Sequence, residues 1–104
     1  MTNLRQEFLK HTKEQSAAVT CVLIQEEHWS IYDPKSILLK QSYTVDGYVK
    51  FLESIDIEYD SGYGTQYFSG TIWYEDGTWS ERREYDGSEW WEHCSCPSIP
   101  EELQ

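Results

Sequence analysis

Two Asp-Gly pairs divide the sequence QYFSGTIWYEDGTWSERREYDGSEWWEHC, residues 66–94, into three β-rich segments. Asp-Gly between alternating β-prone residues is the strongest short signal for a hairpin turn. The two pairs, Asp76-Gly77 and Asp86-Gly87, stand ten residues apart. We therefore predict a three-stranded antiparallel meander with strands over residues 66–75, 78–85 and 88–94.

Two-residue turns at these pairs also predict the register of the strands. In the first hairpin Tyr74 faces Trp79, an aromatic pair that contributes roughly 0.2–1 kcal/mol. In the second hairpin Glu84 faces Glu89, and like charges directly opposite each other destabilise a sheet. The same register pairs Arg82 with Trp91 and Arg83 with Trp90, where cation–π contacts are expected.

The elements before the meander follow from hydrophobic periodicity. Apolar residues at helical spacing predict an N-terminal helix that Thr2 or Asn3 caps and that ends near Ala17. Residues 18–26 are apolar on both faces, which predicts a central strand. The short apolar run 37–39 is a strand or a helix.

Two further segments lie on either side of residue 55. Thr44 and the apolar spacing after it predict a short helix over residues 45–54. Apolar and acidic residues alternate over 55–60, which predicts a half-buried strand. Residues 97–104 are predicted to be extended, because Pro97 and Pro100 oppose regular structure.

Together these segments predict an α+β fold. We expect an antiparallel β-meander of four or five strands with one or two short helices packed on one face. A chain of 104 residues fits a single domain. Its parts are an N-terminal helix at 1–17, an acidic aromatic β-meander at 53–96 and an extended tail at 97–104.

The net negative charge of the chain lies in its second half. Residues 1–52 hold six acids and six bases, whereas residues 53–104 hold thirteen acids and two bases, Arg82 and Arg83. The net charge of −11 therefore lies wholly in the second half. Direct nucleic-acid binding and attachment to an anionic membrane both need a basic footprint, so we expect neither. A partner chosen by charge is basic.

The compartment follows from the first residues and the cysteines. Residues 1–15 contain no apolar segment of a secretory signal. The chain has three cysteines, an odd number that favours a reducing compartment. We expect a soluble cytoplasmic protein, either a monomer or a small homo-oligomer.

Five short motifs resemble a known group of proteins. They are Tyr-Asp-x-Gly-Tyr-Gly at 59–64, Gly-Thr-Ile-Trp at 70–73, Asp-Gly-Thr-Trp at 76–79, Glu-Tyr-Asp-Gly-Ser-Glu-Trp-Trp at 84–91 and Pro-x-Ile-Pro at 97–100. The set resembles small uncharacterised phage and prophage proteins and leaves residues 1–50 unmatched. The resemblance implies a viral origin, with no particular chemistry. In acidic character alone, the chain is also similar to anti-CRISPR and other anti-defence proteins.

Acidic residues of the meander are the candidate partner-binding site. Same-face carboxylates on a strand stand roughly 6.5–7 Å apart, so rows of them can imitate a nucleic-acid backbone. On this hypothesis the protein is a non-enzymatic inhibitor of a basic host defence or nucleic-acid-handling protein. Plain solubility is the alternative explanation of the same charge. The candidate residues are Asp60, Asp76, Glu81, Glu84, Asp86, Glu89, Trp90 and Glu92.

A small-ligand binding module is the rival function. The aromatic residues of the meander would then line a pocket that sequesters a nucleotide signal, with Arg82 and Arg83 near the phosphates. A core built from these aromatics is the simpler explanation. Adjacent Trp90 and Trp91 must point to opposite faces of their strand, so one of them is expected to face outward.

Metal binding and catalysis are not expected. His93, Cys94 and Cys96 lack the paired spacing of a structural zinc site. No nucleophile elbow, phosphate loop or zinc-protease motif is present. We therefore predict no metal, no cofactor and no catalytic residue.

Overall fold

The computed structural model describes residues 2–26, 36–59, 66–85, 88–97 and 99–103. A five-stranded antiparallel sheet has the order β3-β2-β5-β6-β7, and β1 pairs with β4 in a second, two-stranded sheet. The α+β prediction, an antiparallel meander with two short helices, is confirmed. The elements are β1 (Thr2–Asn3), α1 (Leu4–Lys13), β2 (Val19–Glu26), β3 (Ser36–Leu39), α2 (Val45–Ser54), β4 (Glu58–Tyr59), β5 (Phe68–Tyr74), β6 (Trp79–Tyr85), β7 (Ser88–Cys94) and a 3-10 helix (Glu101–Leu103).

Both helices begin at polar caps. The Asn3 side chain accepts a hydrogen bond from the backbone N–H of Gln6 at 3.0 Å, and α1 ends at Lys13, earlier than predicted. Thr44 Oγ1 accepts one from the N–H of Gly47 at 3.0 Å, so α2 begins where the sequence indicated. Such caps satisfy N–H groups that have no partner within the helix. Within the part of the chain described, neither helix is long and apolar enough to cross a lipid bilayer.

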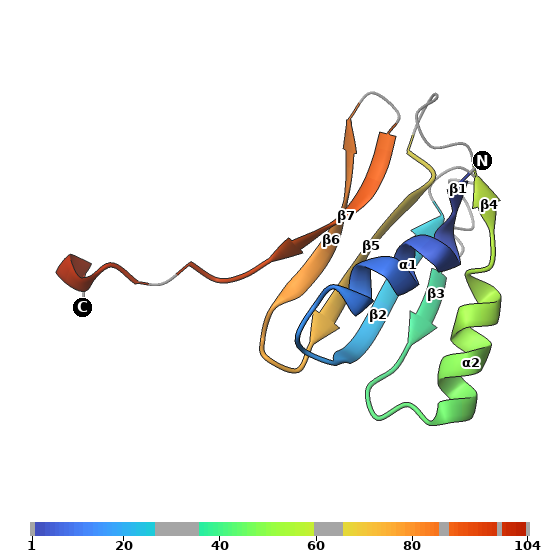
Figure 1. Ribbon diagram of the computed structural model, residues 1–104, viewed down its shortest axis with the longest axis horizontal. Helices are drawn as coiled ribbons and strands as arrows, with labels where there is room; N and C mark the ends of the chain where they lie inside the picture. Colours follow the sequence, from blue (N-terminus) through green and yellow to red (C-terminus); the bar gives the residue numbers. More distant parts are fainter. Residues whose placement is uncertain (1, 27–35, 60–65, 86–87, 98, 104) are drawn as a thin grey trace.

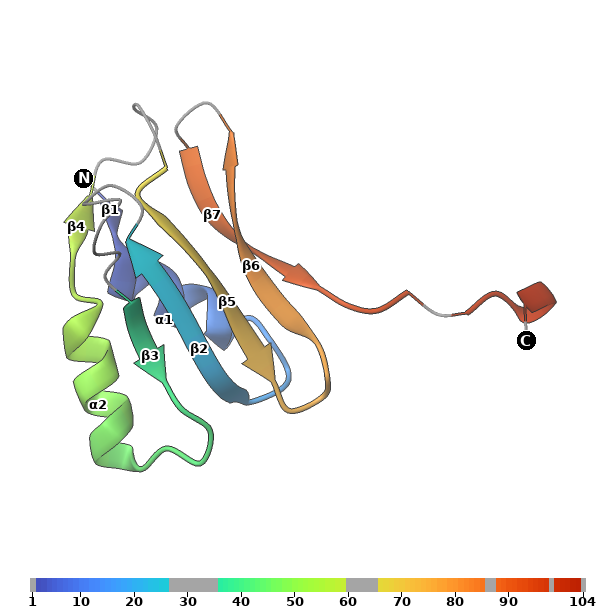
Figure 2. The same ribbon diagram turned by 180° about the vertical axis from the view of Figure 1, so that it is seen from behind.

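The core lies between one face of the sheet and the two helices. Figure 1 shows α1 crossing this face and α2 beside β3. Phe8 of α1 and Phe51 of α2 meet edge to face at 5.3 Å between ring centroids. Val22 and Ile24 of β2 are buried beneath them, which confirms the central strand. In Figure 2, seen from behind, none of the described helices covers the other face of the sheet.

The first hairpin differs from its prediction by one residue. Trp79 pairs with Trp73, not with Tyr74. The loop contains three residues and ends at Gly77, whose φ of 85° is in the left-handed region. The backbone N–H of Tyr74 donates to the carbonyl of Thr78 at 3.0 Å and closes this loop. Asp-Gly serves this longer loop as well as the two-residue turn, so the sequence signal located the turn but not its register.

The second hairpin has the predicted register. Glu84 faces Glu89 and Arg82 faces Trp91, while Arg83 faces Trp90. The turn predicted at Asp86-Gly87 lies outside the described residues.

Two other predictions need correction. The predicted strand 55–60 is mostly absent, because Ile55 continues the helical turn by donating its N–H to the Phe51 carbonyl at 3.2 Å. Within 55–59, the residues of that segment that the structure describes, only Glu58–Tyr59 forms a strand, and it pairs with β1 outside the main sheet. The tail is not wholly extended either, since Leu103 donates to the Pro100 carbonyl at 2.9 Å in the 3-10 turn.

Gly70 gives a test of the β2–β5 pairing. A Cβ atom at this position would stand 2.4 Å from the carbonyl oxygen of Leu23. We expect Gly70→Ala to lower the free energy of unfolding by about 1–3 kcal/mol, because backbone on a central strand must move. Urea denaturation measures this loss.

Gly77→Asn is the matched control. A Cβ at Gly77 meets no atom within 4 Å among the described residues, and asparagine tolerates the left-handed conformation. A loss for Gly70→Ala no larger than that for Gly77→Asn would contradict the packing argument.

Candidate functional site

The alternation of side chains along β5, β6 and β7 gives the sheet two different faces. Toward the helices lie Ile72, Ser80, Arg82 and Trp91, all buried. Away from the helices lies a group that we call the open-face cluster. Its members are Trp73, Trp79, Glu81, Arg83, Trp90 and Glu92.

Aromatic side chains of the open-face cluster reach solvent. Trp73 is 41% exposed and Trp90 is 38% exposed, whereas Trp91 is only 6% exposed. The expectation that one of Trp90 and Trp91 faces outward is therefore confirmed. The one-residue change in the first hairpin also matters here, because it places Trp79 beside Trp73 on the open face.

Arg83 forms ion pairs with two carboxylates of the open-face cluster. Its guanidinium lies 3.1 Å from Glu81 Oε2 and 2.8 Å from Glu92 Oε2. Trp79 Nε1 donates to Glu81 Oε1 at 2.8 Å. Two of the predicted partner-binding carboxylates are thus paired with a cation, which weakens the regular negative row that the sequence suggested.

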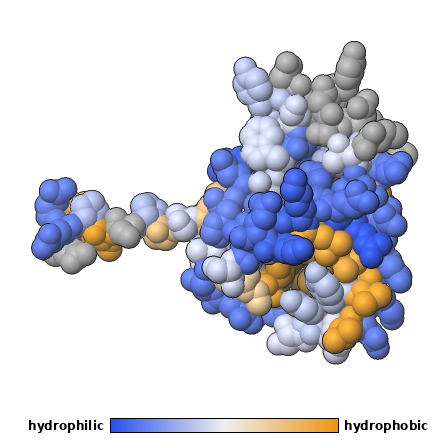
Figure 3. Space-filling view, in the orientation of Figure 1, coloured by the Kyte–Doolittle hydropathy of each residue, from blue (hydrophilic) through white to orange (hydrophobic). Residues whose placement is uncertain are grey.

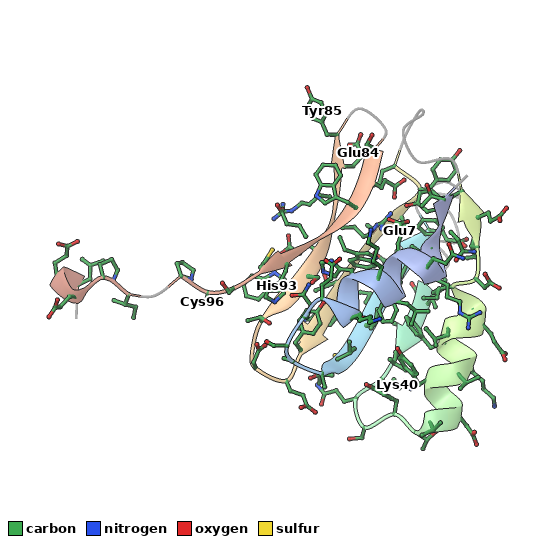
Figure 4. All side chains as sticks on the ribbon, viewed as in Figure 1. Glu7, Lys40, Glu84, Tyr85, His93 and Cys96 are labelled. Carbon is green, nitrogen blue, oxygen red and sulfur yellow. The ribbon has the colours of Figure 1, made fainter. Side chains whose placement is uncertain are left out.

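The other predicted residues are dispersed. Asp76 lies in the first hairpin loop and accepts a hydrogen bond from the Thr78 backbone N–H at 3.0 Å. Hydrogen bonds from the Thr78 side chain and backbone lower the pKa of Asp76. Glu84 is exposed near Tyr85 at one end of β6, far from His93 at the other end of the hairpin (Figure 4). Asp60 and Asp86 lie outside the described residues.

Glu89 is not a surface residue, which corrects its predicted role. It is 6% exposed, and its carboxylate accepts hydrogen bonds from the backbone N–H groups of Tyr67 at 2.7 Å and Phe68 at 3.1 Å. Arg82 Nη2 donates to the same carboxylate at 2.9 Å. Glu84 does face it, but the charge of Glu89 is compensated from the core side.

A buried arginine network connects the meander to the rest of the fold. Arg82 is 7% exposed and contacts Glu7 at 3.3 Å, Glu89 at 2.9 Å and the Tyr59 hydroxyl at 2.9 Å. Its guanidinium carbon lies 5.0 Å from the ring centroid of Trp91. Figure 4 shows Glu7 on α1, over the middle of the sheet. The network therefore joins α1, β4, β6 and β7.

The protonation states within the network follow from its contacts. Burial raises the pKa of Tyr59, and the hydrogen bond to the Glu7 carboxylate raises it further. The phenol therefore stays protonated and donates to Glu7. Burial alone would lower the pKa of Arg82, but Glu7, Tyr59 and Glu89 outweigh burial and raise it. Arg82 is a permanent cation inside the core.

Ser80 and His11 are hydrogen-bonded on the helix-facing side of the sheet. His11 Nε2 lies 2.7 Å from Ser80 Oγ, and Tyr74 hydroxyl lies 2.7 Å from the same atom. That distance fits a nucleophile and its general base. Ser80, however, is 0% exposed, so no substrate reaches its hydroxyl in this conformation. The group is a buried hydrogen-bond chain that links α1 to β6.

The sequence analysis predicted only part of the buried arginine network. It paired Arg82 with Trp91, but it did not bring Glu7 or Tyr59 to the arginine. One available signal is that Arg82 shares its strand face with Trp91, a core residue. A cation on that face needs buried acceptors.

The His93, Cys94 and Cys96 side chains are not grouped around one point. Cys94 is half-buried, Cys96 is exposed, and both are free thiols. His93 Nε2 lies 2.9 Å from Thr78 Oγ1 and away from Cys96 (Figure 4). Among the described residues, no three His, Cys, Asp or Glu side chains are grouped to hold a metal ion. The expectation of no metal stays a prediction.

Comparisons with known proteins add no relative. No protein-family model matches the chain, and neither the curated proteins nor the solved structures contain a significant match. The resemblance to phage proteins therefore stays a prediction.

Arg82→Met tests the buried network. Removing the cation leaves Glu7 and Glu89 without their cationic partner, and breaking a buried ion pair from one side costs about 3–5 kcal/mol. We expect that loss in the free energy of unfolding measured by urea denaturation. Arg83→Met removes the neighbouring exposed cation and should change stability little. Equal losses for the two variants would show that the network does not hold the fold.

His11 makes stability depend on pH. Burial lowers the pKa of His11 below 6.5, although Glu14 opposes this shift and His93 adds to it. Because the unfolded chain binds this proton more readily, the stabilisation is present above pH 6.5 and is lost as pH falls toward the lower folded pKa. We expect the wild type to lose more stability than His11→Gln between pH 7.5 and 5.5, measured by urea denaturation. Parallel pH profiles would contradict the assignment.

Proposed function

We propose that this protein is a non-enzymatic inhibitor that binds a basic, nucleic-acid-handling protein through the open-face cluster. The observation that carries the proposal is an aromatic sheet face, uncovered by the described helices, on a chain with a net charge of −11. Binding would block the partner's nucleic-acid site without any chemical step.

The residues of the cluster suit a protein interface. Tryptophan and arginine are enriched among the few residues that supply most binding energy, and they act best when water is excluded around them. Trp73 and Trp90 are half-exposed anchors, and Arg83, directly opposite Trp90, is already oriented by Glu81 and Glu92. A preoriented surface loses less side-chain entropy on binding.

The negative charge has a different role from the one first expected. Glu89 is buried, and Glu81 and Glu92 are paired with Arg83, so a regular imitation of phosphates is not what supports the proposal. The carboxylates of the meander instead attract a basic partner to this face and raise its association rate. The aromatic anchors then supply contact area.

The identity of the partner is proposed on two separate grounds. That it is a host defence protein, met in the host cytoplasm, depends on the resemblance to phage proteins alone. A nucleic-acid-handling target follows from charge complementarity with an acidic surface.

The rival function, a nucleotide-binding pocket, has weaker support. The guanidinium of Arg82 is occupied by Glu7, Glu89 and Tyr59, and that of Arg83 is held by carboxylates. Among the described residues, neither arginine lines the apolar groove on the helix side of the sheet. We therefore keep the inhibitor as the proposal.

Capture from a host lysate tests the proposal. Immobilised protein should retain a nucleic-acid-binding protein that releases at raised salt, and added protein should displace nucleic acid from it. We expect Trp73→Ala with Trp90→Ala to weaken capture about tenfold or more, as for central anchor residues. Glu84→Lys with Glu92→Lys should slow capture.

A variant of equal charge change serves as the control. Glu53→Lys with Glu58→Lys alters the net charge by the same amount at exposed positions outside the main sheet. Capture should survive this change. An equal loss of capture in both charge variants would contradict the proposal, and so would a lysate from which no nucleic-acid-binding protein is retained.

A further inference from the structure

An apolar groove lies between the two helices, on the side opposite the open-face cluster. Its volume is about 530 Å³, within the range of pockets that hold ligands or peptide side chains. Figure 3 shows the apolar surface below α1 in this view. The main lining residues are Leu9 and Lys13 of α1, Val19 of β2, Tyr43, and Val45 and Tyr48 of α2.

The groove is formed before anything binds in it. The Tyr43 hydroxyl donates to the Val19 carbonyl at 2.8 Å, and the Tyr43 and Tyr48 rings stack at 5.6 Å. Burial raises the pKa of Tyr48, and Tyr43 raises it further, so its ring presents a neutral hydroxyl. Val45 is 80% exposed at the mouth, a large fraction for an apolar side chain in a folded domain.

The C-terminal tail presents a surface that complements the groove. After Cys94 the chain leaves the sheet and runs away from the domain along the longest axis, in both views (Figures 1 and 2). Leu103 is 73% exposed and Ile99 is 64% exposed. Between them stand Glu101 and Glu102, both exposed, in the short 3-10 turn.

The two surfaces match in polarity and in charge. The groove offers apolar walls with one cation, Lys13, and the tail offers apolar side chains with carboxylates. The groove is built from residues 1–52, which hold six acids and six bases, so an acidic tail meets less repulsion there than on residues 53–104. Pro97 and Pro100 stiffen the tail in its outward course, which favours reaching another molecule over folding back.

We propose that the tail of one copy of this chain binds in the apolar groove of a second copy. Leu103 and Ile99 bury their side chains between the helices, and Glu101 and Glu102 approach Lys13. Each contact joins two different surfaces, and a reciprocal exchange of tails about a two-fold axis closes a dimer. This proposal does not depend on the open-face cluster.

Sedimentation equilibrium of the full chain tests the association. From 5 µM to 1 mM in 0.15 M salt, where long-range repulsion between acidic copies is screened, the average mass should rise above the 12.3 kDa of one chain. Leu103→Glu and Val45→Glu should each lower the association constant about tenfold or more. Both residues are exposed, so neither change disturbs the core.

Two further variants identify the contact. Leu38→Glu, at an exposed leucine on the open face, is the matched control and should associate as the wild type does. A mixture of Lys13→Glu with Glu101→Lys/Glu102→Lys should associate more strongly than Lys13→Glu alone.

Three results would overturn the proposal. One is a mass of 12.3 kDa at every concentration. Another is association that Leu103→Glu and Val45→Glu leave unchanged. The third is a groove contacted by the tail of its own chain, seen as a concentration-independent shift of the Val45 amide resonance on Leu103→Glu.

Discussion

The charge of Arg82 in the core is the constraint on which the rest of this fold depends. A guanidinium away from water needs acceptors on several sides, and here they come from α1, β4 and β7. The elements that supply them are distant in sequence, since Glu7 and Glu89 stand at opposite ends of the chain. Satisfying one cation therefore requires that the helix, the short second sheet and the meander assemble together.

The same network explains why the two faces of the sheet differ so strongly. Helix-side positions of β6 and β7 hold Arg82, Glu89 and Trp91, and the ion pair between Arg82 and Glu89 lies inside the molecule. The neighbouring positions face outward and carry the exposed tryptophans and Arg83. An apparently uniform acidic, aromatic hairpin thus separates into a structural face and a face available to a partner.

Sequence patterns predicted the parts of the fold that depend on local chemistry. Thr44 and the spacing after it located α2, and Asp-Gly located the first turn. The register of that hairpin was missed because a three-residue loop and a two-residue turn use the same dipeptide. The burial of Glu89 was missed for another reason: its partners Arg82, Tyr67 and Phe68 approach it only after tertiary assembly, and local patterns do not encode such contacts. Candidate site residues chosen by charge alone therefore mixed exposed carboxylates with a buried one.

The doublets Arg82-Arg83 and Trp90-Trp91 have a consequence for folding. The helix-side positions of β6 are the polar residues Ser80, Arg82 and Glu84, so hydrophobic burial specifies the register of this strand weakly. A slip that inverts both strands of the second hairpin would still place an arginine and a tryptophan on the inner face. What distinguishes the native arrangement is the set of fixed acceptors at Glu7 and Tyr59 and the backbone donors that hold Glu89. A hairpin without α1 and β4 beside it would lack these acceptors, so the contacts with α1 and β4 are what distinguish its two faces.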